Sequence, residues 1–334
     1  MTGKYHKICR GIHQTTSQVG RSVIGNSGRS GIDSTIKSAL RAAVLLPALL
    51  GAGAAYAHGS DINCGNCKAW NAPQAPFKIY GNTWYVGPQG LAALLITGPD
   101  GHILLDGALP QSAPQIIDSI KTLGFRIEDV KLILNSHPHW DHAGGIAALQ
   151  RASGAVVVAS APAAEVLQRG SIGRDDPQFE AGAVTPFPRV AKVRSVRDGE
   201  QVSVGALSLT AHLTPGHTPG GTSWNWQSCE ANRCQNMVYA DSLNPASEDG
   251  FRFSGGAGRP DISAAFKASI ARVAALPCDI VVSVHPSFTN TFEKLAARTA
   301  GGKGFADSGG CSAYAAEASE LLKQRLALEG AAPK

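Results

Sequence analysis

The sequence of 334 residues has few features of a fibrous, repetitive or unfolded protein. Only 16% of its residues are charged and 43% are hydrophobic, so the chain can bury enough apolar surface to fold. Its 38 glycines follow no period, which excludes a collagen-like chain, and no motif recurs at a spacing of 20–50 residues. The longest apolar run, near residues 42–57, is interrupted by a proline and is short for a membrane span.

Most of the chain also lacks an excess of charge of one sign. The net charge of +5 originates in the first 57 residues, where seven lysines and arginines oppose one aspartate and give +6. The remaining residues therefore carry −1. Such a nearly neutral body has no electrostatic preference for nucleic acid or anionic lipid, and we expect neither as a partner.

The first 57 residues are typical of an export segment. Lys37 and Arg41 precede the apolar residues 42–50, and Ala55-Tyr56-Ala57 follows them. This order predicts a signal peptide that is cleaved after Ala57, so that the mature chain begins near His58 and is periplasmic. The alternative is a buried N-terminal helix.

The mature chain, residues 58–334, contains no Pro/Ser-rich linker, and we interpret it as one domain. Hairpins precede helices in each half, which favours two mixed sheets packed face to face with helices outside. Residues 170–190 contain three prolines and little periodicity, which predicts a long surface loop. The expected strands are 77–80, 83–86, 91–97, 102–106, 130–135, 155–159, 192–197, 201–204, 206–213, 221–227, 236–241 and 279–284. The expected helices are 111–123, 144–150, 161–169, 262–275 and 312–328.

Cysteine usage fits export. Cys9 lies in the predicted export segment, and an even number of cysteines in an exported chain favours disulfides. The six that remain allow fifteen pairings: Cys64, Cys67, Cys229, Cys234, Cys278 and Cys311. Cys64 and Cys67 could instead form half of a zinc knuckle, although no second C-x-x-C accompanies them.

The segment His137-Pro-His-Trp-Asp-His142 holds four metal-capable side chains in six residues. His137, His139 and Asp141 alternate, so in an extended loop they project to one side. His142 stands at the start of a predicted helix and can face a second centre. Buried without a metal, these groups would repel one another or lack partners. The segment therefore predicts a metal site.

Two further histidines occupy suggestive positions. His217 lies in Thr214-Pro-Gly-His-Thr-Pro-Gly220, a tight loop after a strand. His285 directly follows an apolar strand, where active-site residues collect in α/β folds. Either could alone be a structural histidine, but beside the His-rich loop we interpret both as metal ligands. We assign no role to the remaining three of the mature chain: His58, His102 and His212.

With these motifs the sequence resembles the metallo-β-lactamase superfamily and, more narrowly, its third subclass (B3). The resemblance runs from about Trp70 to the C-terminal helix. Its narrower features are Tyr80–Gly87, Pro215–Trp224, Val238–Leu243 and Val284–Ser287. It implies an α/β fold of the αββα sandwich type with two zinc ions at one edge. It also implies two ligand sets: His137, His139 and His217 for the first zinc, and Asp141, His142 and His285 for the second.

The resemblance implies a zinc-dependent hydrolase of small-molecule β-lactams, which opens the amide of penicillins, cephalosporins and carbapenems and confers resistance to them. Water held between two zinc ions ionises near neutral pH and supplies the nucleophile. Asp141 would bind metal and orient or relay the proton. We expect the enzyme to act as a monomer.

Further residues take their expected roles from the same resemblance. Ser242 would face the second zinc, Asp241 would point elsewhere, and Asn244 would lie near the substrate carboxylate. The alternative is that Asp241 bridges both metals, as in many hydrolases of the superfamily. Gln178 in the 170–190 loop is a candidate substrate contact. Trp140 would line the pocket wall, with a purely structural role as an equal alternative.

The resemblance also implies disulfides between Cys278 and Cys311 and between Cys229 and Cys234. Some relatives tie an N-terminal cysteine to a cysteine at the position where this chain has Gln89. Cys64 and Cys67 must therefore pair with each other or stay free.

Two other functions share the metal loop. A lactonase or thioesterase of the same superfamily would favour a bridging Asp241 and a cytoplasmic chain, whereas the export segment and the expected disulfides argue against it. A non-catalytic zinc-binding protein is the second alternative. Structural zinc sites are closed by four protein ligands, which does not suit two sites beside a mobile loop.

Overall fold

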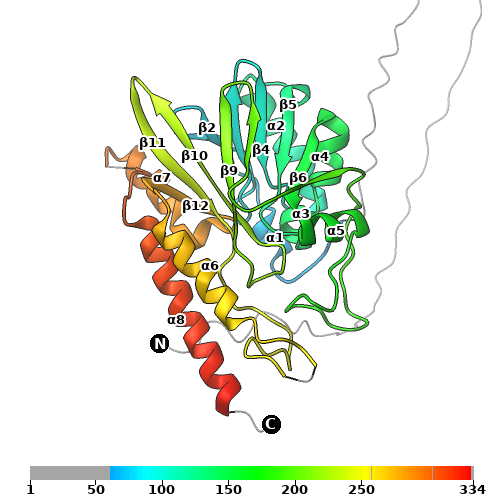
Figure 1. Cartoon of the computed structure of the whole chain (residues 1–334). Helices are drawn as coiled ribbons and strands as arrows, with labels where there is room; N and C mark the ends of the chain where they lie inside the picture. The colour runs from blue at the N-terminus through cyan, green and yellow to red at the C-terminus, as the bar shows by residue number, and fades with distance from the viewer. Residues whose placement is uncertain (1–60, 257, 303, 332–334) are drawn as a thin grey trace, which may run out of the picture. The chain divides into compact units, whose positions relative to one another are not determined.

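The computed structural model describes residues 61–331, except residues 257 and 303. The predicted export segment, its cleavage site and His58 lie outside the described residues. In the described part, two sheets are stacked with helices on their outer faces (Figure 1). This arrangement confirms the αββα sandwich. Within the same residues, the structure has no helix with the length and apolar character needed to cross a membrane.

The first sheet has seven strands in the order β1-β2-β3-β4-β5-β6-β7. The strands from β1 to β4 pair antiparallel, and those from β4 to β7 pair parallel. The predicted hairpin is present, because Gly98 pairs with Gly101 at the β3–β4 turn. The bounds are β1 Phe77–Tyr80, β2 Thr83–Tyr85, β3 Leu94–Gly98, β4 Gly101–Leu105, β5 Val130–Leu134, β6 Val156–Ser160 and β7 Val193–Val196.

The second sheet has five strands in the order β12-β11-β10-β9-β8. Only β11 and β12 pair parallel, and the other neighbours are antiparallel. The bounds are β8 Gln201–Val204, β9 Leu207–Leu213, β10 Thr222–Glu230, β11 Arg233–Ala240 and β12 Ile280–Ser283.

Side chains from both sheets form the central core. Because successive strand residues point to opposite faces, Leu94 and Ile103 of the first sheet meet Trp224, Tyr239 and Val282 of the second. All five are at most 1% exposed. Full burial of an apolar side chain contributes about 1.5–3 kcal/mol, so this layer is a major source of stability.

Helices cover the outer face of each sheet. On the first sheet, Leu95 and Leu104 pack beneath α2 (Ala113–Thr122), α4 (Ile146–Ser153) and α5 (Ala161–Arg169). On the second, Val238 and Val281 pack against α6 (Ser263–Ala275) and α8 (Gly310–Ala331). Figure 1 shows α6 and α8 running side by side along this face.

Several short elements differ from the sequence-based expectation. Three helices were not predicted, α1 (Cys67–Trp70), α3 (Trp140–Ala143) and α7 (Thr291–Thr299), and three 3₁₀ turns also occur: η1 Pro110–Ser112, η2 Ile127–Asp129 and η3 Pro286–Thr289. The hairpin of β10 and β11 is longer than expected, because it continues to the turn residues Ala231 and Asn232, both with positive φ. Its outer half is polar, so it lacks the apolar alternation that marks a strand.

Three disulfides are present in the described residues. Cys229 and Cys234 lie directly opposite each other in the β10–β11 hairpin and are bonded. Cys278, before β12, is bonded to Cys311 in α8. Cys64 is bonded to Cys67, which decides the pairing that the sequence left open.

Candidate metal centre

The six predicted ligands come from four places in the chain that lie at the same end of the sandwich. His137 and His139 follow β5, and His142 belongs to the short helix α3 (Trp140–Ala143). His217 follows β9, and His285 follows β12. Carboxyl ends of strands are where ligands bind in α/β folds, and the loops here converge in that way.

A buried carboxylate, Asp106, anchors the start of the His-rich loop. Its Oδ1 accepts hydrogen bonds from the Ser136 amide at 2.8 Å and from Asn135 Nδ2 at 3.1 Å. Its Oδ2 accepts from Ser136 Oγ at 2.6 Å and from the Tyr239 hydroxyl at 2.9 Å. Asp106 has φ +59°, a left-handed conformation that a non-glycine residue adopts rarely. Such strain persists only where the surrounding contacts hold it, as these four hydrogen bonds do.

The first group of candidate ligands consists of His137, His139 and His217. Each pair of these rings has a centroid separation of 4.9 Å, and one ligand atom from each residue lies within 4.8 Å of the others. All three residues are buried. The Nε2 atom of His137 has no hydrogen-bond partner in the described structure, so the cluster has a buried nitrogen that an ion would satisfy.

The second group consists of Asp141, His142 and His285. Asp141 Oδ2 lies 3.3 Å from His142 Nε2 and 3.6 Å from His285 Nε2, and the two nitrogens are 3.3 Å apart. Three donor atoms thus face a common point. One carboxylate and two imidazoles form a ligand set that zinc accepts, and three imidazoles form another. The residues present therefore fit two divalent ions.

Burial keeps most of these imidazoles neutral in the metal-free protein. Burial, reinforced by the charge of His139, lowers the pKa of His217 to about 3. Burial and His142 lower the pKa of His285 to about 4. Burial likewise lowers the pKa of His137 well below its usual value. Since metal ligation requires the neutral imidazole, these groups are ready to bind an ion at physiological pH.

The pKa values of Asp141 and His139 are set mainly by a neighbouring group of opposite charge. Burial alone would raise the pKa of Asp141, but the charge and hydrogen bond of His142 outweigh it and keep the pKa below its usual value. Burial alone would lower the pKa of His139, but the carboxylate of Asp176 outweighs it and raises the pKa.

Hydrogen bonds on the far side of four rings fix their orientation. His137 Nδ1 donates to Asp241 Oδ1 at 2.8 Å, and His217 Nδ1 donates to the Asn244 carbonyl at 2.7 Å. His285 Nδ1 donates to the Gly90 carbonyl at 3.2 Å. His139 Nε2 donates to both carboxylate oxygens of Asp176 at 3.1 Å. In each ring this contact leaves the other nitrogen for the cluster, as is usual for metal-binding histidines.

The structure places Asp241 behind His137 rather than between the two groups. The residue is fully buried, and its backbone amide donates to Ser223 Oγ at 3.0 Å. A Cβ on Gly221 would collide with Asp241 Oδ2, so only glycine leaves room for the carboxylate there. Ser242 follows it and is 2% exposed. Asn244 contacts the cluster through its backbone carbonyl.

Gln178 lies against the first group, whereas Trp140 is connected to the second group through Trp70. Gln178 Nε2 is 3.4 Å from both His139 Nδ1 and His217 Nε2, the nitrogens that face the first group. Trp140 packs its ring 6.1 Å from that of Trp70, which in turn lies 5.3 Å from the ring of His285.

Sequence reasoning missed Asp106, Asp176, Trp70 and Gly90. Asp106 had a possible signal, because it ends a predicted strand at the sheet edge that carries the ligands. Asp176 and Gly90 lie in loops without periodicity, and their contacts are with histidines 37 and 195 residues away. No local pattern identifies such contacts.

The comparisons with known proteins agree with this geometry. The family model of the metallo-β-lactamase superfamily matches residues 86–230. The Rm3 metallo-β-lactamase is 52% identical, with a TM-score of 0.78, and the match covers 80% of this chain and 100% of that one. The chain belongs to the metallo-β-lactamase superfamily. MEM-A1, a subclass B3 metallo-β-lactamase from a soil metagenome library, is 50% identical over 78% of this chain and 99% of its own, with a TM-score of 0.76.

Two curated proteins are similar to this chain over part of its length only. A hydroxyacylglutathione hydrolase from Anaeromyxobacter dehalogenans is 33% identical over 95 residues, which is 28% of each chain. An uncharacterized protein from Bacillus subtilis, YobT, is 35% identical over 36% of this chain and 50% of its own. The chain thus spans 28% of the length of the first curated relative and 50% of the length of the second. The resemblance to the third subclass is confirmed by the solved structures.

Proposed function

We propose that the protein is a zinc-dependent hydrolase that opens the amide bond of β-lactams, with a range that includes penicillins, cephalosporins and carbapenems. One observation carries the proposal. Two groups of metal-capable side chains, with two buried imidazole nitrogens that lack a hydrogen-bond partner, His137 Nε2 and His142 Nδ1, lie in a chain that is 52% identical to Rm3 metallo-β-lactamase over that enzyme's full length.

Two zinc ions per chain would occupy the two groups, with His137, His139 and His217 holding the first. The second would be held by the remaining three ligands, Asp141, His142 and His285. Bound zinc lowers the pKa of water towards neutrality and polarises a carbonyl oxygen, which is the chemistry that amide hydrolysis needs.

The chain's own residues hold these ligands in place before substrate arrives. Asp241 and the Asn244 carbonyl orient His137 and His217 through hydrogen bonds of 2.8 and 2.7 Å. Such contacts keep each imidazole in the tautomer that directs a lone pair at the metal. Asp141 remains ionised, so it brings negative charge to the second group and would orient the reacting group as a hydrogen-bond acceptor.

Four residues are proposed to contact substrate or its surroundings. Ser242 would face the second zinc, and Asn244 would lie near the ring carboxylate that bicyclic β-lactams share. The Gln178 amide lies over the first group, where it can meet the substrate as it enters. Trp140, whose ring lies tilted against that of Trp70, would form an apolar wall.

Export and assembly are part of the same proposal. Residues 1–57 would be removed as a signal peptide, and residues 58–334 would act as a single periplasmic domain and as a monomer. Disulfides suit an oxidising compartment, and three are present in the described residues. In that location the activity would confer resistance to β-lactams.

A lactonase or thioesterase function is the second candidate. It was expected to go with an Asp241 carboxylate that bridges both metals, and the 2.8 Å hydrogen bond from His137 Nδ1 to Asp241 favours the β-lactamase instead. The direct test compares hydrolysis of a chromogenic cephalosporin with hydrolysis of an acyl-homoserine lactone. We expect turnover of the cephalosporin that a chelator abolishes. Turnover of the lactone alone would transfer the protein to the second candidate.

A further inference from the structure

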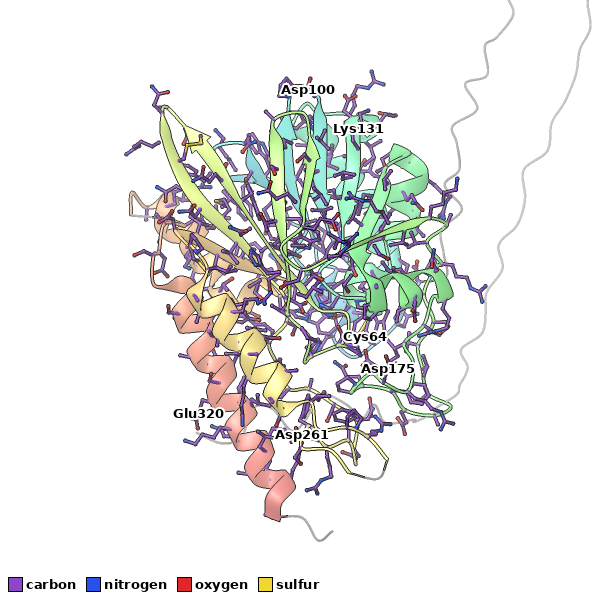
Figure 2. The ribbon with its side chains drawn as sticks, viewed as in Figure 1. Cys64, Asp100, Lys131, Asp175, Asp261 and Glu320 are labelled. Carbon is purple, nitrogen blue, oxygen red and sulfur yellow. A yellow bond between two sulfur atoms is a disulfide. The ribbon has the colours of Figure 1, made fainter. Side chains whose placement is uncertain are left out.

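The segment that links α5 to β7, residues 170–192, contains no helix or strand, yet it places one carboxylate deep in the molecule. Asp176 is 3% exposed, whereas its neighbour Asp175 is exposed. Figure 2 labels Asp175 on this loop. Both oxygens of Asp176 lie 3.1 Å from Nε2 of His139, a candidate ligand of the first metal. A loop that looks like a surface segment thus contacts the metal centre directly.

The loop holds the Asp176 carboxylate firmly. Asp176 donates its amide to the Gly173 carbonyl at 3.0 Å and accepts from the Phe179 amide at 3.1 Å. Its Oδ1 also accepts from the Gln178 amide at 2.8 Å. On the outer side, the Glu248 amide donates to the Pro177 carbonyl at 3.0 Å and ties this loop to the segment after β11. Movement of the loop therefore moves the carboxylate.

The same loop reaches the other nitrogen of the same ring. Gln178 Nε2 lies 3.4 Å from His139 Nδ1, the atom that faces the first group. Two side chains that are two residues apart thus contact both nitrogens of one imidazole. The orientation of His139 and the position of residues 173–179 are consequently linked by short polar contacts.

We propose that Asp176 is a positioning residue that couples the loop of residues 173–179 to the first metal site. Its carboxylate holds the His139 ring with Nδ1 directed at the metal, and metal binding in turn holds the loop against the centre. The proposal rests on the proposed function only in assuming that these histidines bind zinc. Coupling between two binding events is reciprocal, so each half can be measured alone.

The experiment uses the mature protein and three variants. Asp176→Asn keeps an oxygen that accepts from His139 but removes the charge, Asp176→Ala removes both, and Asp175→Asn is the control on the exposed neighbour. Stepwise zinc affinity is measured by competition with a chromogenic chelator, and folding is checked by circular dichroism. Loss of an outer partner of a metal ligand weakens binding about 10–100-fold. We expect zinc affinity to fall about 10-fold in Asp176→Asn and about 100-fold in Asp176→Ala, in one of the two zinc-binding steps only. In the control Asp175→Asn it should change less than about 2-fold.

Hydrogen exchange of peptides covering residues 171–190 provides the second readout, with and without zinc. In the unaltered protein we expect zinc to slow exchange in this loop, and we expect Asp176→Ala to remove that protection. Zinc affinities of the Asp176 variants within 2-fold of the unaltered protein would overturn the proposal. Loop exchange that is insensitive to zinc in the unaltered protein would also overturn it. Both readouts report metal binding and loop order, so they are independent of whether the protein hydrolyses β-lactams.

Discussion

Replacement of Asp241 separates two arrangements of the metal centre. The residue is fully buried, and its Oδ1 accepts the Nδ1 proton of His137 at 2.8 Å. In this arrangement it acts on the first metal only, through His137. Asp241→Asn preserves the size of the side chain and one accepting oxygen, so the variant removes charge with the least change in packing.

The expected magnitude follows from that single contact. Outer partners of metal-binding histidines contribute about 10–100-fold to metal affinity, which corresponds to about 1.4–2.7 kcal/mol. Burial raises the pKa of Asp241 well above its usual value in the metal-free protein, and the nearby Asp106 raises it further. The carboxylate therefore depends on a cation at His137 to remain ionised, and its charge and the first metal stabilise each other.

The assay is a zinc titration of Asp241→Asn followed by metal analysis at saturating zinc. We expect a single weakened step, near two zinc ions per chain at saturation and an unchanged circular dichroism spectrum. Ser242→Ala is the neighbouring control and should keep most of its zinc while its kinetics change moderately. Loss of both metals in folded Asp241→Asn would show that the carboxylate bridges the two ions, and it would refute the reasoning.

Three further predictions address the ligands and the fold. His217→Ala and His285→Ala should each bind about one zinc per chain at saturation, and metal analysis showing two in either would remove that residue from the ligand set. Glu329 is 5% exposed and accepts hydrogen bonds from the backbone amides of residues 253 and 254. Glu329→Gln should therefore lower the free energy of unfolding, measured by urea titration, by about 1–3 kcal/mol. The control Glu320→Gln, at an exposed position, should change it by less than about 0.5 kcal/mol. Burial alone would raise the pKa of Glu329, but hydrogen bonds from Ser254 outweigh it and keep the pKa below its ordinary 4.5. The stability difference between this protein and Glu329→Gln should therefore be full above about pH 4.5 and shrink as the pH falls below it, and a gap that widens on acidification would contradict the contact.

The parts of the fold that were predicted from the sequence are those with strong local patterns. The apolar strands β5 and β12 are short, β-branched and bounded by polar residues, and both occur where expected. The histidines that follow them were found for the same reason. A strand that ends in a metal-capable residue places that residue at the sheet edge, whatever the rest of the chain does.

Elements that depend on distant contacts were not predicted. The helix α7 has few apolar residues, and its Phe292 ring packs against Phe77 and Tyr85, which are more than 200 residues earlier. The four-residue helix α1 is closed by the Cys64–Cys67 disulfide rather than by helix propensity. Tertiary contacts stabilise both helices, and the periodicity of the sequence does not reveal such contacts.

The candidate site shows the same division. Its six candidate ligands form recognisable motifs, whereas the carboxylates that orient them do not. Asp241 was expected to point away from the metals or, as the alternative, to bridge them, and no sequence motif indicated that it accepts from His137. Asp176 lies in a predicted surface loop in which only Gln178 was singled out. Ligand identity is therefore local in sequence, while ligand orientation is set by the tertiary structure.

In the proposed mechanism, metal bound by these histidines opens the β-lactam amide without a protein nucleophile. The most direct test measures carbapenem hydrolysis by the mature chain expressed in a susceptible periplasm, first with clavulanate and then with a chelator. Clavulanate acylates serine nucleophiles, so we expect activity to persist with it and to disappear with the chelator. Activity that falls with clavulanate and survives the chelator would contradict the claim.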